Sequence, residues 1–278
     1  MDDLPDPLTL DTPCEAALRR IALHCASEFA TALDSVATSD DPRGPHRARV
    51  ALRRLTSALD VFAPMLRRKR LAALRARAKR VFRTLGTLRD SDVHTEAQQD
   101  DPGHNDRLRH NAAVRAQVRR DLDRHDAGRF ADKVAALVAP EGDLWRRGTA
   151  ARAMRAGPLG AYASGMLAAV WADCQGHGGS VSAMSPQTRH DFRKKLKTMR
   201  YLAEFFGPLF PGLAQDPFRN DFRDIQDALG TLNDYEVALA LDGRAAPKVL
   251  PAKQTRALVA AEAIWLRLTG APVPWTAG

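Results

Sequence analysis

Two segments of this 278-residue chain match each other at a constant offset, and this repeat constrains the fold more than any other feature. HRARVALRRLTSALDVFAPML at 46–66 aligns with HDFRKKLKTMRYLAEFFGPLF at 190–210, so equivalent residues are 144 positions apart. LGTLRDSDV at 85–93 and LGTLNDYEV at 229–237 have the same offset without a gap. Because two separate matches share one register, we interpret the chain as a tandem duplication.

Apolar residues recur with a helical period along the chain, and no sustained strand-like alternation interrupts them. Clusters of proline and glycine separate the helical segments. Helices are expected at 14–37, 46–63, 67–95, 107–125, 128–138, 158–174, 186–206, 215–241 and 252–269. We predict an all-α fold, a single domain over 1–278 with internal repeats at about 14–140 and 158–270, built as two four-helix-type bundles with pseudo-twofold symmetry.

The overall charge predicts an anionic partner. The formal net charge is +9 and the isoelectric point is about 9.9, and both long-range attraction and counterion release favour binding of anions. The acidic start lacks the features of a signal peptide, and the apolar stretch at 156–172 is short and glycine-rich for a membrane span. We therefore expect a cytoplasmic protein without a membrane span.

The positive charge is concentrated in the first repeat. Residues 46–93 contain fourteen Lys and Arg against three Asp, a net charge of +11 that exceeds the value for the whole chain. Residues 190–237 contain seven basic and eight acidic side chains, and five of those cations lie between Arg193 and Arg200. The first repeat is therefore expected to dominate the electrostatic field.

Both basic helices separate their cations from their apolar residues. At about 100° per residue, His46, Arg49 and Arg53 share one stripe, and the leucines of that helix occupy the opposite side. His190 begins the equivalent stripe in the second repeat. One basic stripe is most simply a solvated helix face, but its retention in two repeats favours a shared ligand surface. Phosphate oxygens suit such a surface, because Arg offers a planar donor fork and Lys a point charge.

Three interpretations stay open for His46 and His190: a structural hydrogen bond near a helix start, a metal ligand, or a phosphate contact. A metal site is the least favoured, because cations or apolar residues occupy the positions three and four residues later. Neighbouring cations repel a divalent ion but favour an anion. No metal and no cofactor are therefore predicted, and the role of the histidines stays open.

Nothing in the repeated segments predicts catalysis. Asp90 and Asp234 occupy equivalent positions, but no nucleophile and base accompany them, so we expect them to cap a helix or orient a neighbouring Arg. Gly86 and Gly230 indicate close helix packing rather than a phosphate loop, because no GxxxxGK[ST] motif follows. We predict that the protein is not an enzyme.

The repeated segments resemble the CHAD domain family, the conserved histidine α-helical domains. HRARVALRRLTSALDVF, LGTLRDSDV, HDFRKKLKTMRYLAEFF and LGTLNDYEV carry the resemblance, which covers most of the chain. It implies paired helical bundles with a basic cleft that binds inorganic polyphosphate, often on polyphosphate granules. The matching positions, implied to bind polyphosphate, are His46, Arg49, Arg53, Arg54, Arg75, Lys79, Arg83, His190, Arg193, Lys194, Lys197, Arg200, Arg219 and Arg223.

The second repeat departs from this pattern at two positions, where Thr198 is opposite Arg54 and Asp227 is opposite Arg83. A symmetric site is therefore not expected, and the first repeat should contribute more. The ExExK motif of the triphosphatase domain that some relatives carry is absent from the chain.

The alternative function is nonspecific binding of a nucleic-acid phosphate backbone, which the charge also favours. Aromatic residues make up 6% of the chain and do not interleave with the basic stripes, so a base-stacking platform is not expected. A further alternative is an adaptor on granule surfaces, with other polyanions and granule-associated proteins as candidate partners. Competition between polyphosphate and duplex DNA distinguishes the first two functions.

Overall fold

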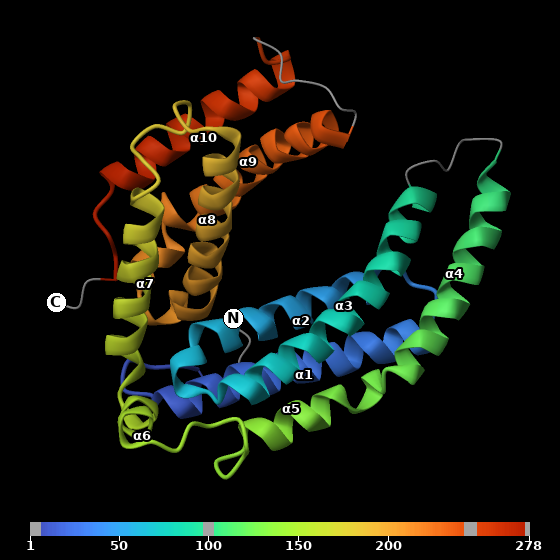
Figure 1. Ribbon diagram of the computed structural model, residues 1–278, viewed down its shortest axis with the longest axis horizontal. Coiled ribbons are helices and arrows are strands. Elements are labelled where there is room, and N and C mark those ends of the chain that lie inside the picture. Colours follow the sequence, from blue (N-terminus) through green and yellow to red (C-terminus); the bar gives the residue numbers. More distant parts are fainter. Residues whose placement is uncertain (1–6, 97–102, 242–248, 276–278) are drawn as a thin grey trace. The chain divides into compact units, whose positions relative to one another are not determined.

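The computed structural model describes residues 7–96, 103–241 and 249–275 (Figure 1). These residues form ten α-helices and several short 3₁₀ segments, and the described ranges contain no β-strand. The predicted all-α fold is confirmed. No helix in the described ranges is long and apolar enough to cross a membrane. The chain divides into two compact units, one of residues 13–157 and one of residues 158–278 together with 1–12.

The unit of residues 13–157 is a bundle in which neighbouring helices pack in sequence. Its helices are α1 (Cys14–Thr38), α2 (Arg43–Val61), α3 (Arg68–Glu96), α4 (His104–Arg124), α5 (Phe130–Val138) and α6 (Thr149–Ala156). α1 packs on α2 and α5, α2 packs on α3, and α3 packs on α4 (Figure 1). The α2/α3 pair therefore carries every cation that the sequence predicts for the first repeat.

Apolar residues at helical spacing hold α2 against its neighbours. Leu52, Leu55 and Leu59 of α2 are buried, as the predicted apolar face requires. Phe29 of α1 meets Phe130 of α5 edge to face, with ring centroids 5.4 Å apart. Each such buried side chain contributes about 1.5–3 kcal/mol. With this face in the core, the cations of α2 lie on its other sides.

The unit of residues 158–278 and 1–12 has four described helices: α7 (Leu159–Gln175), α8 (Pro186–Phe206), α9 (Phe218–Leu241) and α10 (Ala252–Gly270). α7 packs on α8, α8 on α9, and α9 on α10 (Figure 1). The segment before α1 belongs to this unit, because the amide of Leu159 donates to the carbonyl of Thr12 at 2.8 Å. The α8/α9 pair carries the predicted cations of the second repeat.

An aromatic cluster forms the core of this second unit. The ring of Trp171 on α7 lies 6.2 Å from Phe222 of α9, 5.3 Å from Trp265 of α10 and 5.9 Å from Trp275. Phe192 of α8 meets Trp265 at 4.8 Å. These aromatic contacts join all four helices of the unit. Phe192, Leu196, Met199 and Phe206 of α8 are all buried in this core.

The helix bounds differ from the sequence prediction in a few places. α6 was not predicted, because its eight residues bury only Ala151 and so carry no periodic apolar pattern. α2 begins at Arg43, three residues before the expected start, so His46 lies within its first turn. The pseudo-twofold relation between the repeats stays a prediction.

Candidate anion-binding grooves

A groove of about 270 Å³ lies between α2 and α3, and we call it the α2/α3 groove. Three predicted cations line it, Arg53 from α2 and Arg75 and Lys79 from α3. One carboxylate, that of Asp60, lies in the same groove and pairs with Arg75. Leu52, Thr56, Ala78 and Phe82 form the rest of its lining. The fold thus gathers cations that are up to 26 residues apart in sequence into one hollow.

The ring of Phe82 organises two of the predicted arginines. The guanidinium carbon of Arg49 lies 4.2 Å from the ring centroid, and that of Arg53 lies 5.5 Å from it. Arg49 also donates through Nη1 to the carbonyl oxygen of Phe82 at 3.4 Å. Cation–π contacts of this kind contribute about 0.5–1 kcal/mol each at exposed sites. Both guanidinium groups are therefore held in place before any ligand arrives.

Arg49 occupies space that the glycine of the LGTL segment provides. A Cβ atom added to Gly86 would lie 2.3 Å from Nη1 of Arg49, closer than real atoms approach. In the second repeat, a Cβ on Gly230 would lie 3.7 Å from Nη2 of Arg193, which is ordinary contact. The sequence interpretation of close helix packing is therefore refined, because each glycine faces an arginine side chain.

Burial and the charge of Asp90 act on the pKa of Arg49 in opposite directions. Burial lowers the pKa of its guanidinium, and the negative charge of Asp90 opposes this effect. Asp90 itself is exposed. The expected role of Asp90 in orienting a neighbouring arginine stays a prediction.

The other predicted residues of the first repeat lie outside the groove lining. His46 and Arg83 are exposed, and neither makes a hydrogen bond or ion pair with another described residue. Arg54 is half-buried. Burial raises the pKa of the Cys25 thiol on α1 to about 12, and the nearby Arg54 guanidinium opposes that rise. Arg54 thus lies near α1 rather than in the α2/α3 groove.

An equivalent groove of about 320 Å³, the α8/α9 groove, lies in the second unit. Its lining includes the predicted cations Arg200, Arg219 and Arg223 together with Glu204. At the offset of 144, Glu204 matches Asp60, Arg219 matches Arg75, and Arg223 matches Lys79. The two repeats therefore form a hollow from equivalent positions, each with one carboxylate among cations.

Carboxylates neutralise more of the cations in the second repeat. Arg200 pairs with Glu204 and donates through Nε to Oε1 of Gln226 at 3.2 Å. Arg223 pairs with Asp224 at 3.1 Å, and Lys194 pairs with Asp191. In the first repeat, by contrast, Arg53 and Lys79 have no carboxylate partner among the described residues.

The remaining predicted residues of the second repeat are placed as follows. His190 is exposed, and its Nδ1 lies 2.8 Å from Oδ1 of Asn233, an arrangement in which Nδ1 carries the donated proton. Arg193 and Lys197 are half-buried on α8. Across the described parts of the chain, no group of three or more His, Cys, Asp or Glu side chains is placed to hold a metal ion.

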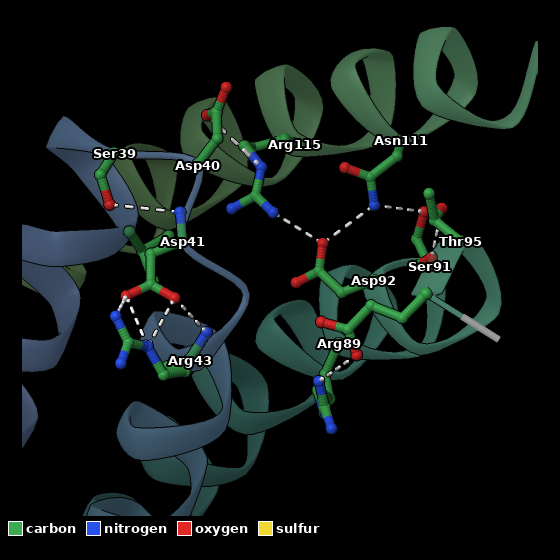
Figure 2. Close-up of polar contacts among 12 residues, drawn as sticks. Ser39, Asp40, Asp41, Arg43, Arg89, Ser91, Asp92, Thr95, Asn111 and Arg115 are labelled. Atoms are coloured by element: carbon green, nitrogen blue, oxygen red, sulfur yellow. Dashed lines mark hydrogen bonds and ion pairs between the residues drawn. The ribbon is translucent and has the colours of Figure 1, made fainter. Parts of the chain in front are cut away.

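A buried polar cluster lies at the far end of the first LGTL segment, and Figure 2 shows it joining α3 to α4. Oδ1 of Asp92 accepts hydrogen bonds from Nη2 of Arg115 at 2.6 Å and from Nδ2 of Asn111 at 2.9 Å. Asp92 and Arg115 are each only 3% exposed. The equivalent carboxylate of the second repeat, Glu236, instead pairs with Arg189 of α8 at 2.5 Å and is partly exposed.

The repeated segments of the chain all lie within one match to a known protein family. The model of the CHAD domain family matches residues 20–241 of the chain. The chain belongs to the CHAD domain family. The match includes both basic helices and both LGTL segments, so the family resemblance read from the sequence is confirmed.

Two solved structures have the same fold as this CHAD domain. The crystal structure of the CHAD domain from the plant Ricinus communis has a TM-score of 0.60 at 20% identity, covering 97% of this chain and 91% of that one. PptA from Streptomyces chartreusis has a TM-score of 0.54 at 18% identity, covering 93% of this chain and 96% of that one. No curated protein matches the sequence. At these identities the likeness establishes the fold.

Sequence reasoning missed two groups that shape the groove of this CHAD domain. Phe82 lies 33 residues after Arg49, and no periodic or repeat signal links them, since Gln226 occupies the equivalent position of the second repeat. Asp60 did have a signal, because the repeat aligns it with Glu204, a second carboxylate in a basic region. A carboxylate therefore lies among the cations at the equivalent position of both grooves.

Proposed function

We propose that this CHAD-family protein binds inorganic polyphosphate through the basic helices of both repeats, with the α2/α3 groove as the stronger site. The observation that carries the proposal is the gathering of Arg53, Arg75 and Lys79 in one hollow, opposed by a single carboxylate. A linear phosphate polymer presents regularly spaced anionic oxygens to such a row of donors. Charge-assisted hydrogen bonds to phosphate are stronger than neutral ones, and Arg can make two at once.

The first repeat supplies the better part of this site. Phe82 and the space at Gly86 hold Arg49 and Arg53 in place, so less side-chain entropy is lost when an anion binds. Arg53, Lys79 and Arg83 need not first be released from a carboxylate. In the α8/α9 groove, a ligand must displace Glu204 from Arg200 and Asp224 from Arg223.

We propose a binding role rather than catalysis, in the cytoplasm and on polyphosphate granules. Burial raises the pKa of Cys14 to about 11 and the pKa values of Cys25 and Cys174 to about 12, so these thiols stay protonated at neutral pH and are poor nucleophiles. The α2/α3 groove offers cations and one paired carboxylate to a ligand. This composition suits the holding of a polyanion.

The α2/α3 groove favours polyphosphate over single-stranded nucleic acid. The one aromatic ring of its lining, Phe82, lies beneath the guanidinium groups of Arg49 and Arg53. A ring covered in this way does not offer a free face for base stacking, which supplies much of the affinity for single strands. Duplex DNA binds through its phosphate backbone alone and is therefore the informative competitor.

The proposal is tested by titrating long-chain polyphosphate into the full chain at physiological salt, with duplex DNA as competitor. The Arg49→Glu/Arg53→Glu variant should lose at least about 100-fold in affinity, because each charge-assisted contact is worth about 1.5–3 kcal/mol. The matched control is Arg109→Glu/Arg120→Glu, the same charge change on α4, whose loss should be at least tenfold smaller.

Three outcomes would contradict the proposal. No binding by the unmodified chain would refute polyphosphate as the ligand. Displacement of polyphosphate by DNA of equal charge would instead mean a nonspecific polyanion surface. A fall in helical circular dichroism in Arg49→Glu/Arg53→Glu would mean that these arginines are structural. The Arg53→Gln/Lys79→Gln variant then decides, because Arg53 is half-exposed and Lys79 is exposed. If that variant binds polyphosphate as tightly as the unmodified chain, the groove is not the site.

A further inference from the structure

A second basic hollow, larger than the α2/α3 groove, lies at the start of α3. Its volume is about 740 Å³, and we call it the α3-start hollow. Among the residues that the structure describes, no carboxylate lines it, and five cations do: Arg67, Arg68, Lys69, Arg75 and Arg146. Arg67, Arg68, Lys69 and Arg146 are outside the set of residues that the family resemblance implies for polyphosphate binding.

A short antiparallel backbone contact builds this hollow. Leu66 and Trp145 form an isolated bridge, in which the amide of Arg67 donates to the carbonyl of Leu144 at 2.8 Å and the amide of Arg146 donates to the carbonyl of Met65 at 2.9 Å. Leu66 and Trp145 are each 2% exposed. Because side chains alternate along extended backbone, burial of these two turns Arg67 and Arg146 outward. The sequence places these two arginines 79 residues apart, and the bridge brings them to one hollow.

Most of the cations here are not neutralised by the protein. Asp143 pairs with Arg67 and with Arg70. Arg68, Lys69 and Arg146 have no carboxylate partner among the described residues, and the side chain of Arg146 donates to the carbonyl of Pro64, at 3.1 Å. Cations in the first turn of a helix also oppose its dipole, at a cost of about 0.3–1 kcal/mol each. An anion in the hollow would offset this cost.

Comparison of the repeats indicates that the bundle does not need these charges. At the offset of 144, the positions of 67–70 are occupied by Pro211, Gly212, Leu213 and Ala214. That uncharged segment still leads from α8 into α9, through a 3₁₀ turn. A basic run is therefore not required for this connection in the second repeat, and a ligand-binding role accounts for its presence in the first.

Arg75 connects the two hollows, because its side chain lines both. From the geometry we infer that the α3-start hollow is a second subsite for the same polyphosphate chain, an inference that rests on the proposed function. A chain bound at Arg53 and Lys79 continues past Arg75 to Arg68, Lys69 and Arg146. Arg68 and Lys79 are eleven residues apart on α3, or roughly 16 Å at 1.5 Å per residue. Only a chain long enough to cover that span uses both subsites, so the second subsite confers a preference for long chains.

The test compares two probes, tripolyphosphate and long-chain polyphosphate, on the Arg68→Gln/Lys69→Gln/Arg146→Gln variant. Long-chain affinity should fall at least tenfold at physiological salt. The slope of log affinity against log salt should also fall by about 2, since each lost phosphate contact removes roughly 0.7. Tripolyphosphate affinity should change less than about twofold, because the α2/α3 groove is intact.

The matched control is Arg109→Gln/Arg120→Gln/Lys133→Gln, which removes the same charge from exposed positions on α4 and α5. Its long-chain affinity should fall less than about threefold. An equal fall in long-chain affinity in the control would mean that net charge alone matters, and it would overturn the inference. The inference would also be overturned if Arg68→Gln/Lys69→Gln/Arg146→Gln lost equal affinity for both probes, or lost no affinity for the long chain. These results differ from failure of the proposed function, in which the unmodified chain binds neither probe.

Discussion

The α2/α3 groove and the α8/α9 groove occupy equivalent positions in the two repeats, but their charges are balanced differently. Each contains three cations and one carboxylate. In the first, Asp60 engages only Arg75, and an aromatic ring holds Arg53. In the second, Glu204 and Asp224 each engage an arginine, and Gln226 replaces the ring. Two of the three cation positions are shared, since Arg75 matches Arg219 and Lys79 matches Arg223, but the first repeat leaves more of its cations available to a ligand.

The largest expected difference between the repeats concerns stability, at the equivalent carboxylates Asp92 and Glu236. Arg115→Ala leaves Asp92 buried without its cation and should lower the free energy of unfolding by about 3–5 kcal/mol. Arg189→Ala should cost only about 1 kcal/mol, because its pair with Glu236 is partly exposed and water can replace it. Urea unfolding followed by circular dichroism measures both.

A control for this prediction removes the stranded charge. Asp92→Asn introduced into the Arg115→Ala variant should recover part of the lost stability, because a neutral amide is less costly to bury than a carboxylate. Equal losses in Arg115→Ala and Arg189→Ala would mean that burial does not distinguish the two pairs.

An intermediate effect is expected at the glycines of the LGTL segments. Gly86→Ala should move the Arg49 guanidinium away from Phe82 and lower polyphosphate affinity about fivefold, which corresponds to the loss of about 1 kcal/mol of cation–π and positioning energy. Gly230→Ala should leave affinity unchanged, because Arg193 already leaves room for the added methyl group. Isothermal titration calorimetry with long-chain polyphosphate measures the difference.

Stability separates this positioning effect from simple disruption. Alanine is the better helix former by about 1 kcal/mol, so Gly86→Ala should keep or raise the unfolding midpoint while affinity falls. A fall in midpoint together with affinity would mean that α2 and α3 had moved apart, and the space at Gly86 would then serve packing rather than the arginine.

The smallest effect is expected at the carboxylate of each groove. Asp60→Asn should raise polyphosphate affinity about threefold, since it frees Arg75 and removes a negative charge from the groove, and exposed ion pairs are worth about 0.2–1 kcal/mol. Glu204→Gln should have a smaller effect, because Gln226 still holds Arg200. Titration at two salt concentrations measures both, and a fall in affinity on Asp60→Asn would show that Asp60 orients Arg75 for the ligand.

The fold was largely predictable because its signals are local. Helical periodicity and proline or glycine breakers located nine of the ten described α-helices within a few residues. The short helix α6 was missed, since one buried residue in eight gives no period. The candidate site was predictable in part. The family resemblance indicated Arg53, Arg75 and Lys79, which do line one groove, but it also indicated Arg54, which lies near α1.

The sequence by itself determined that the chain is helical, that it carries a repeat of 144 residues, and which helix faces hold the cations. These properties depend on residue spacing within one helix or on similarity between two segments, and both can be read from the sequence alone. Only the tertiary structure decided which cations are available. Phe82 beneath Arg49, Asp143 beside Arg67 and Arg115 against Asp92 are contacts between segments 23 to 76 residues apart. Helix packing determines which of these residues meet, and a contact between segments so far apart produces no periodic pattern in the sequence.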